Sequence, residues 1–335
     1  MMLFVSTALL PVTMLKSPQD FWWAVVTAMI TTAISVMLIL IGTWLDYEYC
    51  APVAEYPAYQ FDHLLLSLGI FMFSFGGHSV FPTIQHDMKH PQHFTKSSIL
   101  AFVVVFIMYI PITVLGYMVY GDSLKDSIIM SIQSSYIQQA ANLFIAVHCI
   151  LTLTIVINPL NQEIEHMLKI PHHFGWKRIL LRSSTLLAIV FSAETVPSFG
   201  PILNLIGGTT VAFTSAIMPC LFYLYLHAQE KRVNEKIRKG VHSKHRIPTF
   251  NQILERTPPL VLGINIFVIV VAVICGIATT QSAVVELATS SFSVPCYLSS
   301  SSPNNQDSVS HAVHCCGHHQ NVSRYGSSSF CPAIS

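Results

Sequence analysis

Residues 63–86 read HLLLSLGIFMFSFGGHSVFPTIQH, an uncharged stretch bounded by Asp62 and Asp87. About 20 mostly apolar residues in a helix cross a hydrocarbon core roughly 30 Å thick, so this stretch is long enough to span a bilayer. It also carries two adjacent glycines, Gly76 and Gly77, well away from both of its ends. Glycine weakens a helix interior, so the stretch predicts a membrane-spanning element that is interrupted near its middle.

Five further uncharged stretches surround this one, over residues 21–45, 97–121, 127–162, 195–229 and 257–285. Hydrophobic residues make up 52% of the 335 residues and charged residues 10%, and the mean hydropathy is +0.56. Soluble domains carry about 25% charged residues. The composition therefore predicts an all-α polytopic membrane protein and excludes a soluble enzyme. A net charge of +1 provides no basic surface for phosphates, which excludes a nucleic-acid-binding protein.

We expect about seven full transmembrane helices, preceded by a truncated first helix. Residues 1–15 are apolar but too short to cross alone, and they have neither the basic leader nor the cleavage site of a signal peptide. The expected spans are Phe21 to Ile41, His63 to Thr83, Ser98 to Tyr120, Ile137 to Asn158, Ile179 to Val196, Val211 to His227 and Leu260 to Thr280.

The distribution of basic residues predicts how these spans are oriented. If Lys16 is cytoplasmic, 15 of the 17 Lys and Arg residues fall in cytoplasmic segments, as the positive-inside rule requires. The C-terminal tail is then on the non-cytoplasmic side. Asn321, in the sequence Asn-Val-Ser, is a candidate glycosylation site in that tail.

The tail, residues 282–335, is rich in Ser, His and Cys and has almost no charge, which predicts disorder. Its His and Cys residues fit no closed tetrahedral pattern, so we expect no metal site. Cys50 lies in an expected outer loop, on the same side as the four cysteines of the tail. An oxidising compartment would allow disulfides among these residues, and the sequence leaves their pairing open.

The interruption within residues 63–86 is the candidate substrate site. Free N–H groups at a helix break, together with the positive end of the following half-helix, suit a substrate carboxylate, and free carbonyls suit an ammonium group or a cation. The alternative is a kinked helix packed tightly through its small residues. The candidate substrate-binding residues are Ser74, Phe75, Gly76, Gly77 and His78.

Ionisable and polar side chains within spans are costly, so they are the candidates for ion coupling or gating. His78 and His148 titrate near neutral pH and could relay a proton, whereas a neutral histidine bonded between helices is the alternative for His148. Thr152 and Asn158 lie near one face of the same span, where they either line a path or bond to backbone. Glu194 is an interfacial carboxylate or an ion-gating group.

Pro111 and Pro159 predict further interruptions, because proline removes a backbone donor and displaces the carbonyl four residues earlier. Each is expected to act as a hinge or as a simple kink. The chain contains no Ser-His-Asp set, H-E-x-x-H sequence or phosphate-binding loop that would support hydrolysis or ATP-driven pumping. We therefore expect no enzyme activity and no cofactor other than a transported H⁺ or Na⁺.

Two adjacent segments, FGGHSVFPTI over residues 75–84 and MKHPQHF over residues 88–94, resemble a signature of the amino acid/auxin permease family. The resemblance is to the vacuolar and vesicular-type members, and it covers residues 1–281. Later matching segments are GYMVYG at 116–121, PSFG at 197–200, LIG at 205–207 and MPCL at 218–221.

This resemblance implies a partial bundle of the inverted-repeat fold of the bacterial leucine transporter, comprising helices four to eleven without helices one to three. The segment from Ser74 to His78 would be the interrupted helix six, which supplies half of the central substrate site. The implied function is secondary active transport of small neutral amino acids by alternating access, coupled to protons or sodium. The membrane would be vacuolar, lysosomal or vesicular, with the plasma membrane as the alternative.

Two other functions remain to be compared with transport. One is a truncated, non-transporting isoform or fragment that acts only through a full-length partner or as a homo-oligomer in the bilayer. The other is a seven-helix receptor, but the distribution of charge gives the opposite orientation to that of such receptors.

Overall fold

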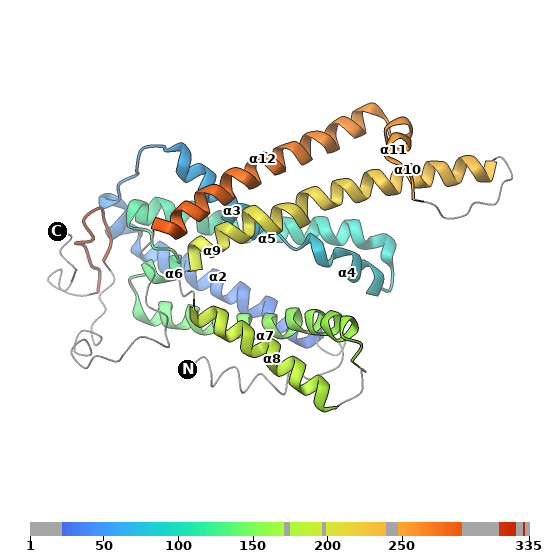
Figure 1. Cartoon of the computed structure of the whole chain (residues 1–335). Helices are drawn as coiled ribbons and strands as arrows, with labels where there is room; N and C mark the ends of the chain where they lie inside the picture. Colours follow the sequence, from blue (N-terminus) through green and yellow to red (C-terminus); the bar gives the residue numbers. More distant parts are fainter. Residues whose placement is uncertain are drawn as a thin grey trace. The chain divides into compact units, whose positions relative to one another are not determined.

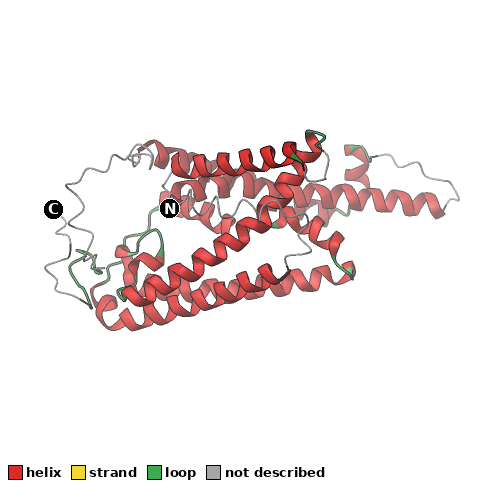
Figure 2. Ribbon diagram, turned by 90° about the horizontal axis from the view of Figure 1, so that it is seen from below, coloured by secondary structure: helices red, strands yellow, loops and turns green. Residues whose placement is uncertain are grey.

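The computed structural model describes residues 22–170, 175–195, 199–238, 247–289, 315–325 and 331. These residues form helices joined by loops, and no strand occurs among them (Figure 2). Six helical segments of this described part are long and apolar enough to cross a membrane, which supports the predicted all-α polytopic membrane class. They are Trp23–Val53, His63–His86, Pro91–Ser123, Ser135–Met167, Gly200–Arg238 and Pro259–Ala288. The short first helix expected over residues 1–15 lies outside the described residues.

The chain divides into two compact units, of which the first contains residues 1–58, 103–197 and 294–335. Helices α2 and α7 pack along each other in this unit (Figure 1). Ile39, Ile132 and Ala141 form the centre of its apolar core. The described elements of this unit are α2 (Trp22–Cys50), η2 (Ala51–Val53), the larger part of α5 (Phe94–Tyr120), η5 (Gly121–Ser123), α6 (Ile128–Ser131), α7 (Ser135–Met167) and α8 (Trp176–Thr195).

The second unit contains residues 59–102 and 198–293. Helix α12 packs against α3, α9 and α10 (Figure 1). The elements of this unit, besides the start of α5, are α3 (Phe61–Ser74), η3 (His78–Val80), α4 (Phe81–Asp87), η4 (Pro91–His93), α9 (Phe199–Ile206), the π-helical η6 (Gly207–Val211) and η7 (Phe213–Ile217), α10 (Met218–Arg238), α11 (Phe250–Arg256) and α12 (Pro259–Thr289).

The prolines do not interrupt their helices as the sequence predicted. Pro111 lies inside α5 and Pro159 lies inside α7, and both helices continue beyond them. A proline removes one backbone hydrogen bond from a helix, but packing and the remaining bonds of a long apolar helix hold the segment in place. The expected span 137–158 is accordingly part of a helix that ends only at Met167.

Two other expectations differ from the structure in their details. The expected span 179–196 coincides with α8, which is helical but is not among the six segments that are apolar enough to cross a membrane. The expected start of the tail at residue 282 falls inside α12, which continues to Thr289 because Ala283 to Ala288 include several apolar helix formers. Residues 315–325 of the tail, predicted to be disordered, have a defined structure that includes two disulfides.

Candidate functional site

The predicted interruption of residues 63–86 is present. Helix α3 ends at Ser74, whose hydroxyl donates to the carbonyl oxygen of Ile70 at 2.9 Å. The Gly76 N–H bonds to the carbonyl of Phe73 at 3.0 Å, and Gly77 has φ = +112°. A side chain at this φ would be strained, so the turn requires glycine at position 77. The chain then restarts as η3 and α4, which leaves the polar backbone of the turn outside any continuous helix.

His78 begins the element that follows this turn and lies among aromatic rings. Its ring centroid is 4.9 Å from that of Phe81 and 5.5 Å from that of Phe102. The side chain is half-buried, and its Nδ1 atom is buried with no hydrogen-bond partner among the described residues. A buried polar atom of this kind is costly, so it is a natural point for a substrate, ion or water to bind.

Close backbone contacts hold α3, η6 and α12 together in the second unit. A Cβ atom added at Gly207 would lie 1.9 Å from the carbonyl oxygen of Gly69, and one added at Gly276 would lie 2.8 Å from that of Gly208. The Thr279 hydroxyl donates to the carbonyl oxygen of Leu65 at 3.2 Å. Small residues allow membrane helices to approach in this way, so the packing expected as the alternative to a site is present beside the break.

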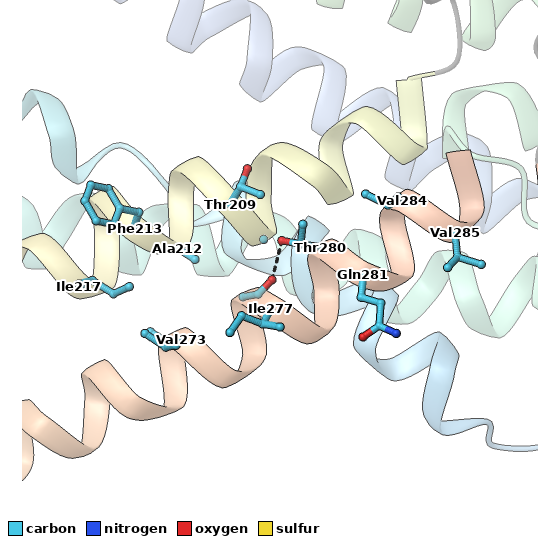
Figure 3. Close-up of a pocket in the computed structure, with 13 residues that line it drawn as sticks. Thr209, Ala212, Phe213, Ile217, Val273, Ile277, Thr280, Gln281, Val284 and Val285 are labelled. Carbon is cyan, nitrogen blue, oxygen red and sulfur yellow. Dashed lines mark hydrogen bonds between the residues drawn. The ribbon is translucent and has the colours of Figure 1, made fainter. Parts of the chain in front are cut away.

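Two apolar cavities lie along the same helices. One, of about 570 Å³, runs between the π-helical segments and α12 (Figure 3). Thr280 lines it, but its hydroxyl is bonded to the carbonyl of Gly276 at 2.6 Å. The other, of about 290 Å³, is lined by residues that include Leu68, Phe71 and Met72 of α3. Both cavities have few polar groups to orient an amino acid, so the turn before His78 remains the better candidate.

His148 occupies a different unit and is bonded between helices. Its Nδ1 atom is 2.7 Å from the hydroxyl oxygen of Thr32 and 3.1 Å from the carbonyl oxygen of Ala28, both on α2. Its Nε2 atom is 3.4 Å from the hydroxyl of Thr152, one turn further along α7. His148 therefore lies bonded between helices α2 and α7, as in the alternative given for it, and Thr152 lies beside it.

Asn158 belongs to a buried ionic cluster that was not predicted from the sequence. Its Oδ1 atom accepts a bond from Nη1 of Arg182 at 3.1 Å. Oε1 of Glu165 accepts from Nε of Arg182 at 2.7 Å and from Nε of Arg178 at 3.0 Å. All three charged side chains are at least 95% buried. The spacing of Asn158, Asn161 and Glu165 at i, i+3 and i+7 on α7 was the signal for one polar face.

The remaining candidates lie at the ends of elements. Glu194 is half-buried at the end of α8, one residue before its last described residue Thr195. Asn321 is exposed in the tail, directly after the turn of residues 317–320 and next to Val322, which pairs with Cys316.

The chain is similar to known transporter sequences. Residues 1–243 match the family model described as "Transmembrane amino acid transporter protein". The chain is 28% identical over 234 residues to "Amino acid transporter AVT1D" of Arabidopsis thaliana, a match that covers 69% of this chain and 38% of the relative. It is 31% identical over 172 residues to "Amino acid transporter AVT1H" of the same species, which covers 50% of this chain and 40% of the relative.

A third relative is "Lysine histidine transporter-like 1" of Arabidopsis thaliana, 28% identical over 174 residues, which are 49% of this chain and 38% of the relative. No solved structure matches the chain. The chain spans about two fifths of the length of the curated relatives it matches. Because the family model matches well over half of its residues, the chain belongs to the transmembrane amino acid transporter protein family.

Proposed function

We propose that this chain acts in secondary active transport of small neutral amino acids across a membrane by alternating access. The observation that carries the proposal is the helix break from Ser74 to His78, with a left-handed Gly77 and a buried histidine nitrogen, in a chain of this family. Transporters with discontinuous helices place the substrate at such a break, where half-helix ends face its charged groups. The relatives' names refer to amino acid transport, and one of them to lysine and histidine, which supports amino acids as the substrate class; the preference for small neutral ones is part of the proposal.

In this proposal the backbone of Ser74, Phe75 and Gly76 faces the carboxylate or ammonium group of the substrate. His78 carries the coupling proton, with sodium as the alternative coupling ion. The fold proposed around this element is the inverted-repeat bundle of the bacterial leucine transporter. No enzyme chemistry is part of the proposal, since the family is one of transporters.

Uptake into proteoliposomes tests this proposal. The purified chain would be reconstituted with an inward proton gradient and supplied with labelled neutral amino acids, beside the full-length AVT1D relative as the positive control. We expect uptake that stops when a protonophore removes the gradient. Uptake by the relative but not by this chain, with both inserted equally, would contradict transport by the chain itself.

A substitution at His78 tests the coupling role. We expect His78→Ala to remove the pH dependence of uptake while the protein still inserts, because no other titratable ring lies at the break. The measurement is the initial uptake rate across a pH series. His63→Ala, at the exposed start of α3, is the matched control and should keep the pH dependence. If His78→Ala keeps it as well, His78 does not carry the proton.

We further propose that the tail lies on the non-cytoplasmic side of a vacuolar, lysosomal or vesicular membrane. The exposure of Asn321 and the disulfides of the tail support this side, because glycan transfer and disulfide formation take place in the secretory lumen. In eukaryotic cells we expect a glycan that a glycosidase removes and that Asn321→Gln abolishes, as seen by gel mobility. Labelling of the tail from the cytoplasmic side by an impermeant reagent would contradict this orientation.

A further inference from the structure

Residues 315–325, here called the tail hairpin, are tied to the end of α2 in the first unit. Cys50, the last residue of α2, forms a disulfide with Cys316, and Cys315 forms a second disulfide with Cys331. The backbones of Cys316 and Val322 exchange two hydrogen bonds, of 2.8 and 3.2 Å. Cys50 and Cys316 are 0% and 1% exposed, so the disulfide between them is shielded from solvent while the hairpin stays in place.

One end of the tail hairpin is held by Arg324. Its guanidinium lies 3.7 Å from Oδ1 of Asp46, a carboxylate of α2 that is fully buried. Oδ2 of Asp46 accepts bonds from the hydroxyl of Tyr120 and the N–H of Gln133, both at 2.8 Å. Arg324 also donates to the carbonyl oxygen of Leu45. Arginine stays charged at every pH of interest, so the guanidinium at this end keeps its charge across the pH range of the test below.

The other end is held by His318, whose charge does depend on pH. The backbone N–H of His318 donates to the carbonyl oxygen of Val53 at 3.3 Å. Its Nδ1 atom bonds to Oδ2 of Asp122 in η5 and lies 3.6 Å from Oε2 of Glu55. Among the described residues the ring of His319 also faces it, with centroids 4.7 Å apart. Two carboxylates from two segments of the first unit therefore attract a protonated His318.

We propose that the tail hairpin is a pH-dependent clasp, closed over the Cys50–Cys316 disulfide when His318 is protonated and opened more often when His318 is neutral. Loss of the proton removes the charge that both carboxylates attract, while Arg324 and the disulfide keep the hairpin attached. The His318 end then separates from Asp122 and Glu55, and solvent reaches the buried disulfide.

The sign of this dependence follows from the partners of His318. The hydrogen bond to Asp122, helped by the charge of Glu55, raises the pKa of His318 above its ordinary value. Because this pKa is raised, the protonated His318 stabilises the closed hairpin fully below about pH 6.5, the ordinary histidine pKa. The stabilisation is lost as the pH rises through the pKa that His318 has in the closed hairpin. The clasp is therefore tighter in an acidic compartment than in neutral or alkaline surroundings.

The rate at which the Cys50–Cys316 disulfide is reduced measures this opening. The full chain, purified in detergent, would be treated with tris(2-carboxyethyl)phosphine at about pH 6 and about pH 8.5, on either side of the ordinary histidine pKa. Alkylation and peptide mass mapping would follow this disulfide separately from Cys315–Cys331. Each rate would be divided by the rate for oxidised glutathione in the same buffer, which removes the pH dependence of the reductant.

We expect the normalised rate to be about two- to fivefold higher at the higher pH, the effect of losing an exposed ion pair. His318→Gln, which is neutral at every pH, should be reduced fast at both, whereas His63→Gln, at the exposed start of α3 and away from the hairpin, is the matched control and should behave like the wild type. Asp122→Asn, a second variant, should weaken the pH dependence if His318→Gln fails to fold. A wild-type rate that is independent of pH or faster in acid, or His318→Gln with the wild-type profile, would overturn the proposal.

Discussion

Replacing Glu165 with glutamine is expected to destabilise the first unit by about 3–5 kcal/mol, the usual cost of removing one partner from a buried ion pair. Oε1 of Glu165 accepts bonds from Arg178 and Arg182 at 3.0 and 2.7 Å, inside the protein. Glutamine keeps the size of the side chain but removes its charge. Arginine cannot deprotonate in a protein, so two buried positive charges lose the carboxylate that they share.

The measurement is the thermal midpoint of the detergent-purified chain, followed by size-exclusion chromatography after heating. Glu163→Gln is the matched control, since Glu163 is exposed on the same helix and its replacement should change the stability by less than about 0.5 kcal/mol. Equal midpoints for Glu165→Gln and Glu163→Gln would show that the cluster does not hold α7 and α8 together. A lower midpoint for Glu165→Gln alone is the expected result.

Replacing Gly207 with alanine is the second change with a large expected effect, a loss of about 3 kcal/mol or more from the second unit. The new Cβ would lie 1.9 Å from the carbonyl oxygen of Gly69, which is backbone and cannot rotate away. Helix α3 must therefore move from the start of η6. Overpacking of an interior usually costs about 1–3 kcal/mol. The cost here is at the upper end or above it, because no change of side-chain rotamer relieves a clash with backbone.

The same chromatography after heating measures this effect. Gly263→Ala in α12 is the matched control, because a Cβ atom there meets nothing within 4 Å. That variant should be as stable as the wild type or more stable by up to about 1 kcal/mol, since alanine favours a helix over glycine. A Gly207→Ala protein with an unchanged midpoint would mean that α3 and η6 are not packed as closely as the structure has them.

The interruption of residues 63–86 could be predicted from sequence because its cause is local. Gly77 adopts a backbone conformation that other residues reach only with strain, and no distant contact is needed to specify the turn. The prolines were a less reliable signal of a helix interruption. Pro111 and Pro159 remove one helical bond each, but helices α5 and α7 are long enough to continue through the loss.

Arg178 and Arg182 show the limit of reading charge from sequence. Both are among the Lys and Arg residues that place their loop on the cytoplasmic side. That rule treats a basic residue near a helix end as exposed to solvent. In the structure they are buried against Glu165. Which carboxylate neutralises an arginine depends on which helices are neighbours, and the periodicity of α7 alone indicates a polar face without naming what covers it.

The sequence by itself determined the membrane class, the family and the position of the helix break, because apolar length and glycine conformation depend on consecutive residues. Only the tertiary structure decided the disulfide partners, the bonding of His148 to α2 and the ionic cluster on α7 and α8. These features join residues that are far apart in the chain. Their partners follow from how the helices pack, a three-dimensional property that no local pattern of residues specifies.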